Sequence, residues 1–233
     1  MYLELSIIGT ALLLLFETTR SHRQLRRAIR RRPPPPTLER YPSLTVIRPI
    51  KGLDPGAREN IAAALNHGYP AEVETLFVFD DDSEPALPLV EEAIAAHQHG
   101  AHPTDARVLF AGSPPEERTG KLHAMIAGLR EAHGELIVFA DSDIRPDRQA
   151  LRTLVETLCS TPDAGSAFAP VVAVCSDRTA GDVGYSLLLN GLYGPAASES
   201  SDRNHGSLPF IMGQLMVFRR STIQAIGGLE CAE

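Results

Sequence analysis

The sequence predicts an α/β domain with a mostly parallel sheet and flanking helices, preceded by one N-terminal transmembrane helix. Two observations indicate the α/β domain: short apolar runs rich in strand-forming residues alternate with longer helical patterns, and turn-forming residues separate them. An apolar run followed directly by arginines indicates the transmembrane helix. With 233 residues, 43% of them hydrophobic, the chain is long enough for one domain with its own core.

The N-terminal segment carries the apolar run Leu5 to Phe16, which is separated from Met1 to Leu3 only by Glu4. Counted from the first residue, this segment is marginally long enough for a bilayer core of ~30 Å, which takes about 20 helical residues. The positive-inside rule then places the domain on the cytoplasmic side of a membrane, most simply a bacterial inner membrane. The alternative is an amphipathic helix in the membrane interface. The arginines on which this depends are Arg20, Arg23, Arg26, Arg27, Arg30, Arg31 and Arg32.

Composition excludes several classes of protein. The net charge is −7, and the arginine run has no interleaved aromatic residues, so nucleic acid is not an expected partner. Cys159, Cys175 and Cys231 show no zinc-ligand spacing, which argues against a zinc site and a disulfide framework. There is no GxGxxG and no GxxxxGK[ST] motif, so neither a dinucleotide site of the Rossmann type nor a P-loop is supported.

We expect a transmembrane helix at residues 1–19, a basic and proline-rich linker at 20–42, and the α/β domain from residue 43 to 233. Within this domain, apolar runs predict strands at Leu44–Pro49, Val73–Phe79, Arg107–Phe110, Leu136–Ala140 and Ala167–Val174. Helical patterns occupy the segments between them, at Glu59–His67, Leu87–Gln98, Lys121–Ala132, Gln149–Leu158 and Asp182–Leu192.

Acidic residues follow two of the predicted strands. Asp80, Asp81 and Asp82 come after the second strand, and Asp141 and Asp143 come after the fourth. Ligands of open parallel sheets bind at the carboxyl ends of the strands, so these side chains are expected to share one pocket. Mg²⁺ or Mn²⁺ is typically held by one or two carboxylates and completed by substrate phosphates, which makes Asp141 and Asp143 candidate metal ligands. The alternative is that Asp143 caps a helix starting near Pro146.

Lys121 opens a predicted helix directly after Thr119 and Gly120. Its ammonium group and the positive end of the helix dipole would both favour a diphosphate. An ordinary exposed lysine is the alternative interpretation of Lys121.

These residues, taken in order, resemble the inverting glycosyltransferases of the GT-A type. The similarity is to family 2 and, more closely, to family 21, the ceramide glucosyltransferases with their bacterial hopanoid-associated members. The blocks that carry the resemblance are Arg48 to Pro55, Asp80 to Asp82, Lys121 to His123, Asp141 to Asp143, Gly213 to Met216, Arg219 with Arg220, and Gly227 to Leu229.

The resemblance implies a GT-A (nucleotide-diphospho-sugar transferase) fold and transfer of glucose or N-acetylglucosamine from a UDP-sugar, with inversion. It also implies Mg²⁺ or Mn²⁺ and a membrane lipid as acceptor, such as ceramide or a hopanoid. Metal binding then falls to Asp141 and Asp143, and the acceptor side to Gly213 and Gln214. Residues implied on the donor side are Pro49, Lys51, Asp80, Asp81, Asp82, Lys121 and Asp141.

The resemblance also implies motifs that these residues lack. Family members carry a third acidic motif, whose aspartate acts as base, and a (Gln/Arg)-x-x-Arg-Trp motif. The sequence contains no tryptophan, so we expect both motifs beyond Glu233 and a domain that is incomplete at its C-terminal end. We therefore expect this chain alone to bind donor with little transferase activity. Two alternatives stay open: a family 2 polysaccharide or polyprenol-phosphate sugar transferase, and a non-catalytic, membrane-tethered nucleotide-sugar-binding fragment.

Overall fold

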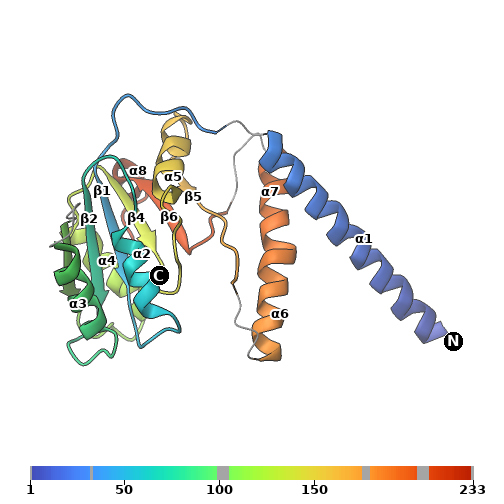
Figure 1. Cartoon of the computed structure of the whole chain (residues 1–233), viewed down its shortest axis with the longest axis horizontal. Helices are drawn as coiled ribbons and strands as arrows, with labels where there is room; N and C mark the ends of the chain where they lie inside the picture. Colours follow the sequence, from blue (N-terminus) through green and yellow to red (C-terminus); the bar gives the residue numbers. More distant parts are fainter. Residues whose placement is uncertain (1, 32–33, 99–104, 175–178, 204–209, 232–233) are drawn as a thin grey trace. The chain divides into compact units, whose positions relative to one another are not determined.

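The structure is a computed structural model that describes residues 2–31, 34–98, 105–174, 179–203 and 210–231. The chain divides into two compact units (Figure 1). The helical unit comprises Met1–Pro34 and Pro170–Phe210, and the sheet unit comprises Pro35–Ala169 and Ile211–Glu233. Arg32, Pro33 and Cys175 lie outside the described residues. The domain bounds expected from the sequence stay a prediction.

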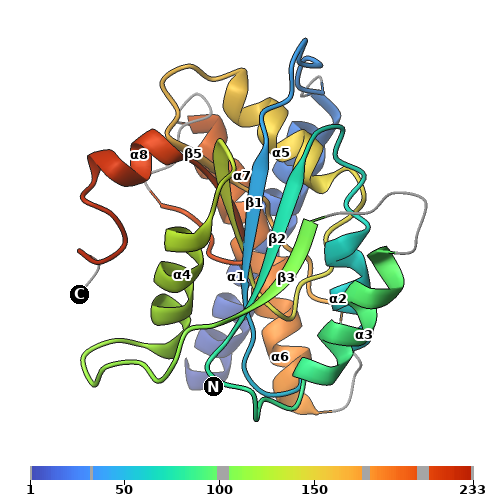
Figure 2. The same cartoon turned by 90° about the vertical axis from the view of Figure 1, so that its left-hand side faces the viewer.

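The sheet unit is built on six strands in the order β3-β2-β1-β4-β6-β5. Strands β1 to β4 run parallel, whereas β6 lies antiparallel between β4 and β5 (Figure 2). The sheet is therefore mixed. The strand bounds are β1 Leu44–Pro49, β2 Val73–Phe79, β3 Asp105–Phe110, β4 Leu136–Ala140, β5 Ser166–Phe168 and β6 Leu215–Arg219.

Three of the predicted strands, β1, β2 and β4, have the predicted bounds. All residues of β2 and β4 are buried, as expected for central strands covered on both faces. The structure starts β3 two residues earlier than predicted. Of the predicted strand Ala167–Val174, only Ala167 and Phe168 are in a strand, β5, and β6 was not predicted.

Helices cover both faces of the sheet. On one face, α2 and α3 pack over Phe77 and Phe79, and α5 packs over Val46 and Val138. On the other face, α4 and α8 pack over a cluster that includes Ile47. Helix α3 has its predicted bounds, and α2, α4 and α5 start within two residues of theirs. The helix bounds are α2 Ala57–Leu65, α3 Leu87–Gln98, α4 Gly120–Glu131, α5 Ala150–Cys159 and α8 Arg220–Ala225.

The helical unit contains α1 and a run of three consecutive helical segments. Helix α1 contacts α7 and the π-helical turn η1. Thr179 and Asp182 form a capping box at the start of α6, which explains why the helix begins there. The bounds are α1 Tyr2–Arg31, α6 Ala180–Leu188, η1 Leu189–Tyr193 and α7 Gly194–Arg203.

The predicted N-terminal transmembrane helix is wrong, because no described helix combines the length and the apolarity needed to cross a membrane. The apolar run Leu5 to Phe16 is bounded by Glu4 and Glu17, and arginines begin at Arg20. At 1.5 Å per residue this run extends only about 18 Å, against a hydrocarbon core of ~30 Å. The predicted single-span inner-membrane localisation, with its cytoplasmic domain, depended on that helix and is corrected with it.

Candidate functional site

The predicted site segments meet at one edge of the sheet. Strands β1, β2 and β4 are parallel, so Lys51, Asp80 and Asp141 all follow the carboxyl ends of their strands. Strand β6 runs the other way, which brings Gly213 and Gln214, just before it, to the same edge. The backbone N–H of Asp141 donates to the carbonyl oxygen of Gln214 at 2.9 Å. The topology thus brings together the segments that the sequence predicted for the donor and acceptor sides.

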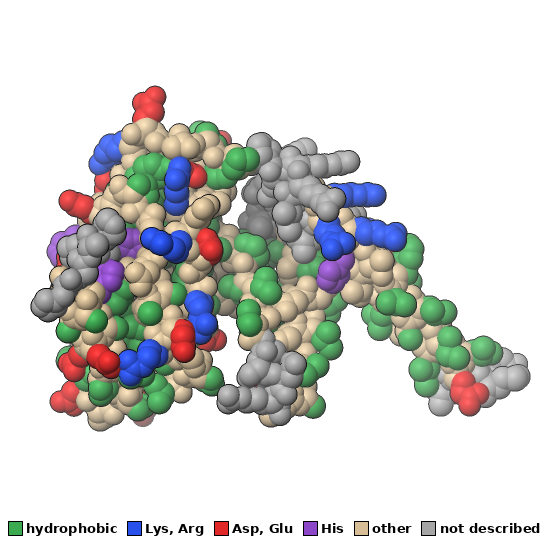
Figure 3. Space-filling model, viewed as in Figure 1, with side chains coloured by type: hydrophobic (Ala, Val, Ile, Leu, Met, Phe, Trp, Pro, Cys, Tyr) green, Lys and Arg blue, Asp and Glu red, His purple; other side chains and the backbone are tan. Residues whose placement is uncertain are grey.

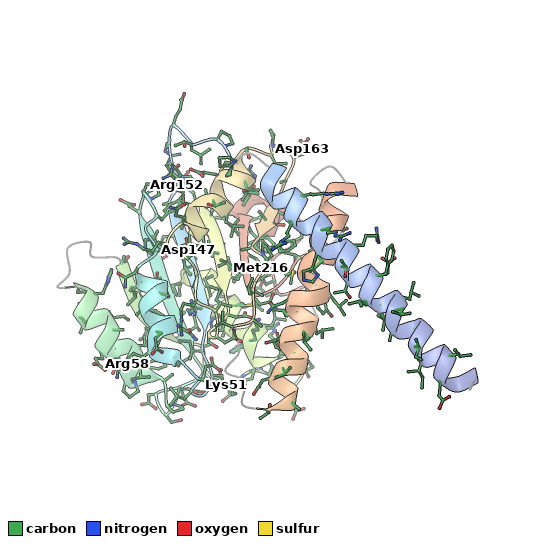
Figure 4. All side chains as sticks on the ribbon, turned by 45° about the vertical axis from the view of Figure 1, so that its right-hand side comes forward. Lys51, Arg58, Asp147, Arg152, Asp163 and Met216 are labelled. Atoms are coloured by element: carbon green, nitrogen blue, oxygen red, sulfur yellow. The ribbon has the colours of Figure 1, made fainter. Side chains whose placement is uncertain are left out.

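Lys51 and Asp80 link the loops after β1 and β2. Lys51 Nζ lies 2.7 Å from Asp80 Oδ2, and the lysine side chain is largely exposed (Figure 4). The hydrogen bond to Asp80 raises the pKa of Lys51. The backbone N–H of Gly52 donates to Glu84 at 2.7 Å, so a second carboxylate of the β2–α3 loop holds the β1 loop. Glu84 was not among the predicted site residues.

The other two aspartates after β2 have different surroundings. Asp81 accepts hydrogen bonds from the Ser83 hydroxyl at 2.5 Å and from its backbone N–H at 2.8 Å, which lower the pKa of Asp81. Asp82 is exposed. Of the three consecutive aspartates, Asp80 is therefore the one that links to a neighbouring strand end.

Lys121 and Asp141 form the second ion pair of this edge, with 2.5 Å between Nζ and Oδ1. Helix α4 begins at Gly120, one residue before the predicted start, and the Thr119 side chain caps it by accepting the N–H of Leu122. This cap points the first turn of α4, with Lys121, toward the end of β4. Burial raises the pKa of Asp141, while the hydrogen bond from Lys121 acts in the opposite direction.

Asp143 is exposed and lies close enough to Asp141 for their charges to interact. It does not cap α5, because that helix begins at Ala150 with Gln149 as its N-cap residue. The capping alternative for Asp143 is therefore wrong, and its carboxylate is not used to cap α5.

A divalent metal at this site could be bound by two carboxylates, those of Asp141 and Asp143. The described ranges contain no group of three or more His, Cys, Asp or Glu side chains suited to hold a metal ion. Asp141 and Asp143 alone would match the Mg²⁺ arrangement in which one or two carboxylates are completed by substrate phosphates and water. The residues present therefore fit a metal that binds together with a diphosphate.

A match to a family model places the chain among glycosyltransferases. A mannosyltransferase from Pyrobaculum calidifontis, solved in complex with GDP-Man and Mn²⁺, superposes with a TM-score of 0.57 at 22% identity. The superposition covers 94% of this chain and 58% of the mannosyltransferase. The model of Glycosyl transferase family 21 matches residues 5–232, so the chain belongs to this family, as its motifs indicated.

The chain is also similar to ceramide glucosyltransferases. That of Candida albicans is 28% identical over 131 residues, which cover 52% of this chain and 23% of the relative. That of Gibberella zeae is 29% identical over 140 residues, which cover 54% of this chain and 25% of the relative. The chain thus spans about a quarter of the length of these curated relatives.

Proposed function

We propose that this chain carries the donor site of an inverting hexosyltransferase that moves glucose or N-acetylglucosamine from a UDP-sugar to a lipid such as ceramide. The single observation that carries the proposal is the Lys121–Asp141 ion pair at the carboxyl edge of the sheet. It places a cation and a candidate metal ligand side by side, where a sugar diphosphate needs both.

Each residue of this edge has a proposed role. Asp141 and Asp143 would hold Mg²⁺ or Mn²⁺, which supplies Lewis-acid stabilisation of the charge on the departing diphosphate. Lys121 would bind a diphosphate oxygen at the start of α4. Asp80, held by Lys51, would accept hydrogen bonds from the uridine base or ribose, a role that its two carboxylate oxygens allow. The mannosyltransferase solved with GDP-Man and Mn²⁺ supports a donor site in which a metal ion binds together with the nucleotide sugar.

The lipid acceptor is supported by the names of the relatives and by exposed apolar side chains in the helical unit. Tyr185 and Tyr193 are 57% and 53% exposed, and Leu187 between them is 67% exposed. The apolar run of α1 is exposed as well, and Arg and His side chains follow it (Figure 3). We propose that this unit rests against the lipid surface that presents the acceptor.

Vesicle co-sedimentation tests this contact. Leu13→Asp in α1 should lower the fraction of chain bound to vesicles that contain anionic lipid. Leu53→Asp replaces a similarly exposed leucine of the sheet unit and should leave that fraction unchanged. Equal vesicle binding by both variants would contradict the proposed lipid contact and would leave the proposed donor site untouched.

The general base is not assigned to any of these residues. A base would remove the proton of the acceptor hydroxyl, a role that contributes roughly 10²- to 10⁴-fold to the rate. We propose that the 233-residue chain binds donor but turns it over slowly. Robust turnover by the purified chain would contradict this part of the proposal.

Calorimetry with UDP-glucose and UDP-N-acetylglucosamine, with and without Mn²⁺, tests the donor site. We expect binding that depends on Mn²⁺ and is lost in Asp141→Ala and Asp143→Ala. Asp163→Ala is the matched control, because this exposed carboxylate lies at the opposite end of the sheet unit from Lys51 (Figure 4). No binding by the folded chain, or equal loss in the control, would contradict the proposed function.

A further inference from the structure

Arg48 is a buried cation at the centre of the sheet unit. It belongs to β1, between β2 and β4, and only 1% of its surface is exposed. Burial lowers the pKa of Arg48 to about 10, so the side chain remains charged at neutral pH. Burying a charge is costly unless the surroundings stabilise it, and a buried arginine next to the carboxyl end of β1 therefore requires a specific partner.

The partner is the loop that carries the two candidate metal ligands. Arg48 Nη2 donates to the carbonyl oxygen of Ile144 at 2.6 Å and to that of Ser142 at 3.1 Å. Asp143 and Asp141 are the two strongest of the charges that stabilise the guanidinium. Its Nε and Nη1 atoms are buried and have no hydrogen-bond partner in the part of the chain that the structure describes.

Two residues that follow β1 hold the same loop. Asn60, at the start of α2, donates through Nδ2 to the carbonyl oxygen of Ser142 at 3.3 Å and accepts from Arg145 Nε at 3.2 Å. The Ser142 hydroxyl donates to Asp54 at 2.6 Å. The loop after β4 is thus fixed by contacts from the β1–α2 segment, with Arg48 beneath it.

We propose that Arg48 is a positioning residue that prepares Asp141 and Asp143 to bind a divalent cation together with a nucleoside diphosphate. This inference rests on the proposed function and adds a residue that does not touch the ligand. Arg48 fixes the backbone on both sides of Asp143. Its charge offsets the mutual repulsion of the Asp141 and Asp143 carboxylates before a metal binds. Side chains behind the first shell of a metal site commonly act in this way.

The test is Mn²⁺ affinity in the presence of UDP, measured by electron paramagnetic resonance of free Mn²⁺ on the 233-residue chain. Arg48→Lys keeps the charge but cannot reproduce the planar pair of donors. We expect it to weaken Mn²⁺ binding about tenfold, the lower end of what outer-shell changes cost, and Arg48→Met to weaken it further. Urea denaturation of each variant reports the folded fraction separately.

The matched control is Ile47→Ala. Ile47 is the preceding residue of β1, is fully buried, and faces the cluster under α4 on the opposite side of the sheet. Its truncation lowers stability by about 2–5 kcal/mol without touching the loop after β4. If Arg48 only stabilised the fold, Ile47→Ala would weaken Mn²⁺ binding as much as Arg48→Lys.

The outcomes distinguish a failure of this inference from a failure of the proposed function. Parent affinity in folded Arg48→Lys, or equal loss in Ile47→Ala, overturns the positioning role while the donor site stands. No Mn²⁺–UDP binding by the parent overturns the donor site and this inference together. If the arginine variants do not fold, Ser142→Ala tests whether the loop after β4 must be held in place. This substitution removes the hydrogen bond from the Ser142 hydroxyl to Asp54. Unchanged Mn²⁺ affinity would show that fixing the loop does not matter for metal binding, and would overturn the inference.

Discussion

Lys121 Nζ lies 2.5 Å from Asp141 Oδ1, so the carboxylate that we propose as a metal ligand is already paired with a cation of the protein. A metal that binds Asp141 must compete with this ammonium group. Once displaced, Lys121 would be free to bind the diphosphate that accompanies the metal. The ion pair therefore suggests that metal and nucleotide bind together.

Lys121→Ala should separate two effects of Lys121: its competition with the metal for Asp141 and its binding to the diphosphate. Without the competing ammonium, Mn²⁺ alone should bind at least as tightly as in the parent. Mn²⁺–UDP should bind about ten- to a hundredfold more weakly, because a hydrogen bond to a charged group contributes about 1.5–3 kcal/mol. Calorimetry measures both affinities. Lys51→Ala is the control for Mn²⁺ alone, since Lys51 pairs with Asp80, and weaker binding of Mn²⁺ alone to Lys121→Ala would contradict the competition.

Gly134→Ala should destabilise the sheet unit. A Cβ atom at residue 134 would lie inside van der Waals distance of the backbone of Leu44 and Thr45, which cannot move without disturbing β1. Overpacking of this kind costs about 1–3 kcal/mol. Urea denaturation measures it. Gly120→Ala is the control, because a Cβ atom there meets nothing within 4 Å, and similar stability of the two variants would show that the loop before β4 adapts.

His67 should make stability depend on pH between about 6.5 and 4. Burial, with a smaller contribution from His97, lowers the pKa of His67 to about 4. The unfolded chain takes up the proton near pH 6.5 and the folded chain does not, so stability falls as the pH drops through this range. We expect a loss of about 1–3 kcal/mol, allowing for partial screening by solvent.

The measurement is the free energy of unfolding of the parent and of His67→Asn at pH 7, 5.5 and 4. Asparagine can accept the N–H of Tyr69 that His67 Nδ1 accepts now, at 3.2 Å. Titration of the acidic residues is common to both proteins, so the difference between their pH slopes isolates His67. Identical slopes would show that the pKa of His67 is the same in the folded and unfolded chains.

Glu74→Gln should also lower stability. Burial alone would raise the pKa of Glu74, but hydrogen bonds from Thr45, His133 and Arg107 lower it, so the folded chain holds a carboxylate here. The amide of glutamine would direct an N–H group at these donors and leave some unpaired, at a cost of about 1–3 kcal/mol. Chemical denaturation at pH 7 measures the loss. The exposed Glu72→Gln should change stability little, and equal values for both would contradict a structural role of the Glu74 contacts.

Local pattern predicted the centre of the sheet well. Strands β1, β2 and β4 and helix α3 have the predicted bounds because their residues are buried or periodic along the whole element. Strand β6 was missed because Leu215–Arg219 is a strand only through its pairing with β4 and β5. The transmembrane prediction failed because the apolar run is too short, and the same helix continues to Arg31.

The sequence by itself determined which residue types follow the strand ends, and the family motifs among them. Parallel strands then brought Lys51, Asp80, Lys121 and Asp141 to one edge, as the α/β pattern indicated. Only the tertiary structure decided which lysine pairs with which aspartate, and that Arg48 binds the loop of the candidate metal ligands. The physical reason is sequence separation: Arg48 and Ile144 are 96 residues apart, and their contact arises from the pairing of β1 with β4, which local periodicity does not encode.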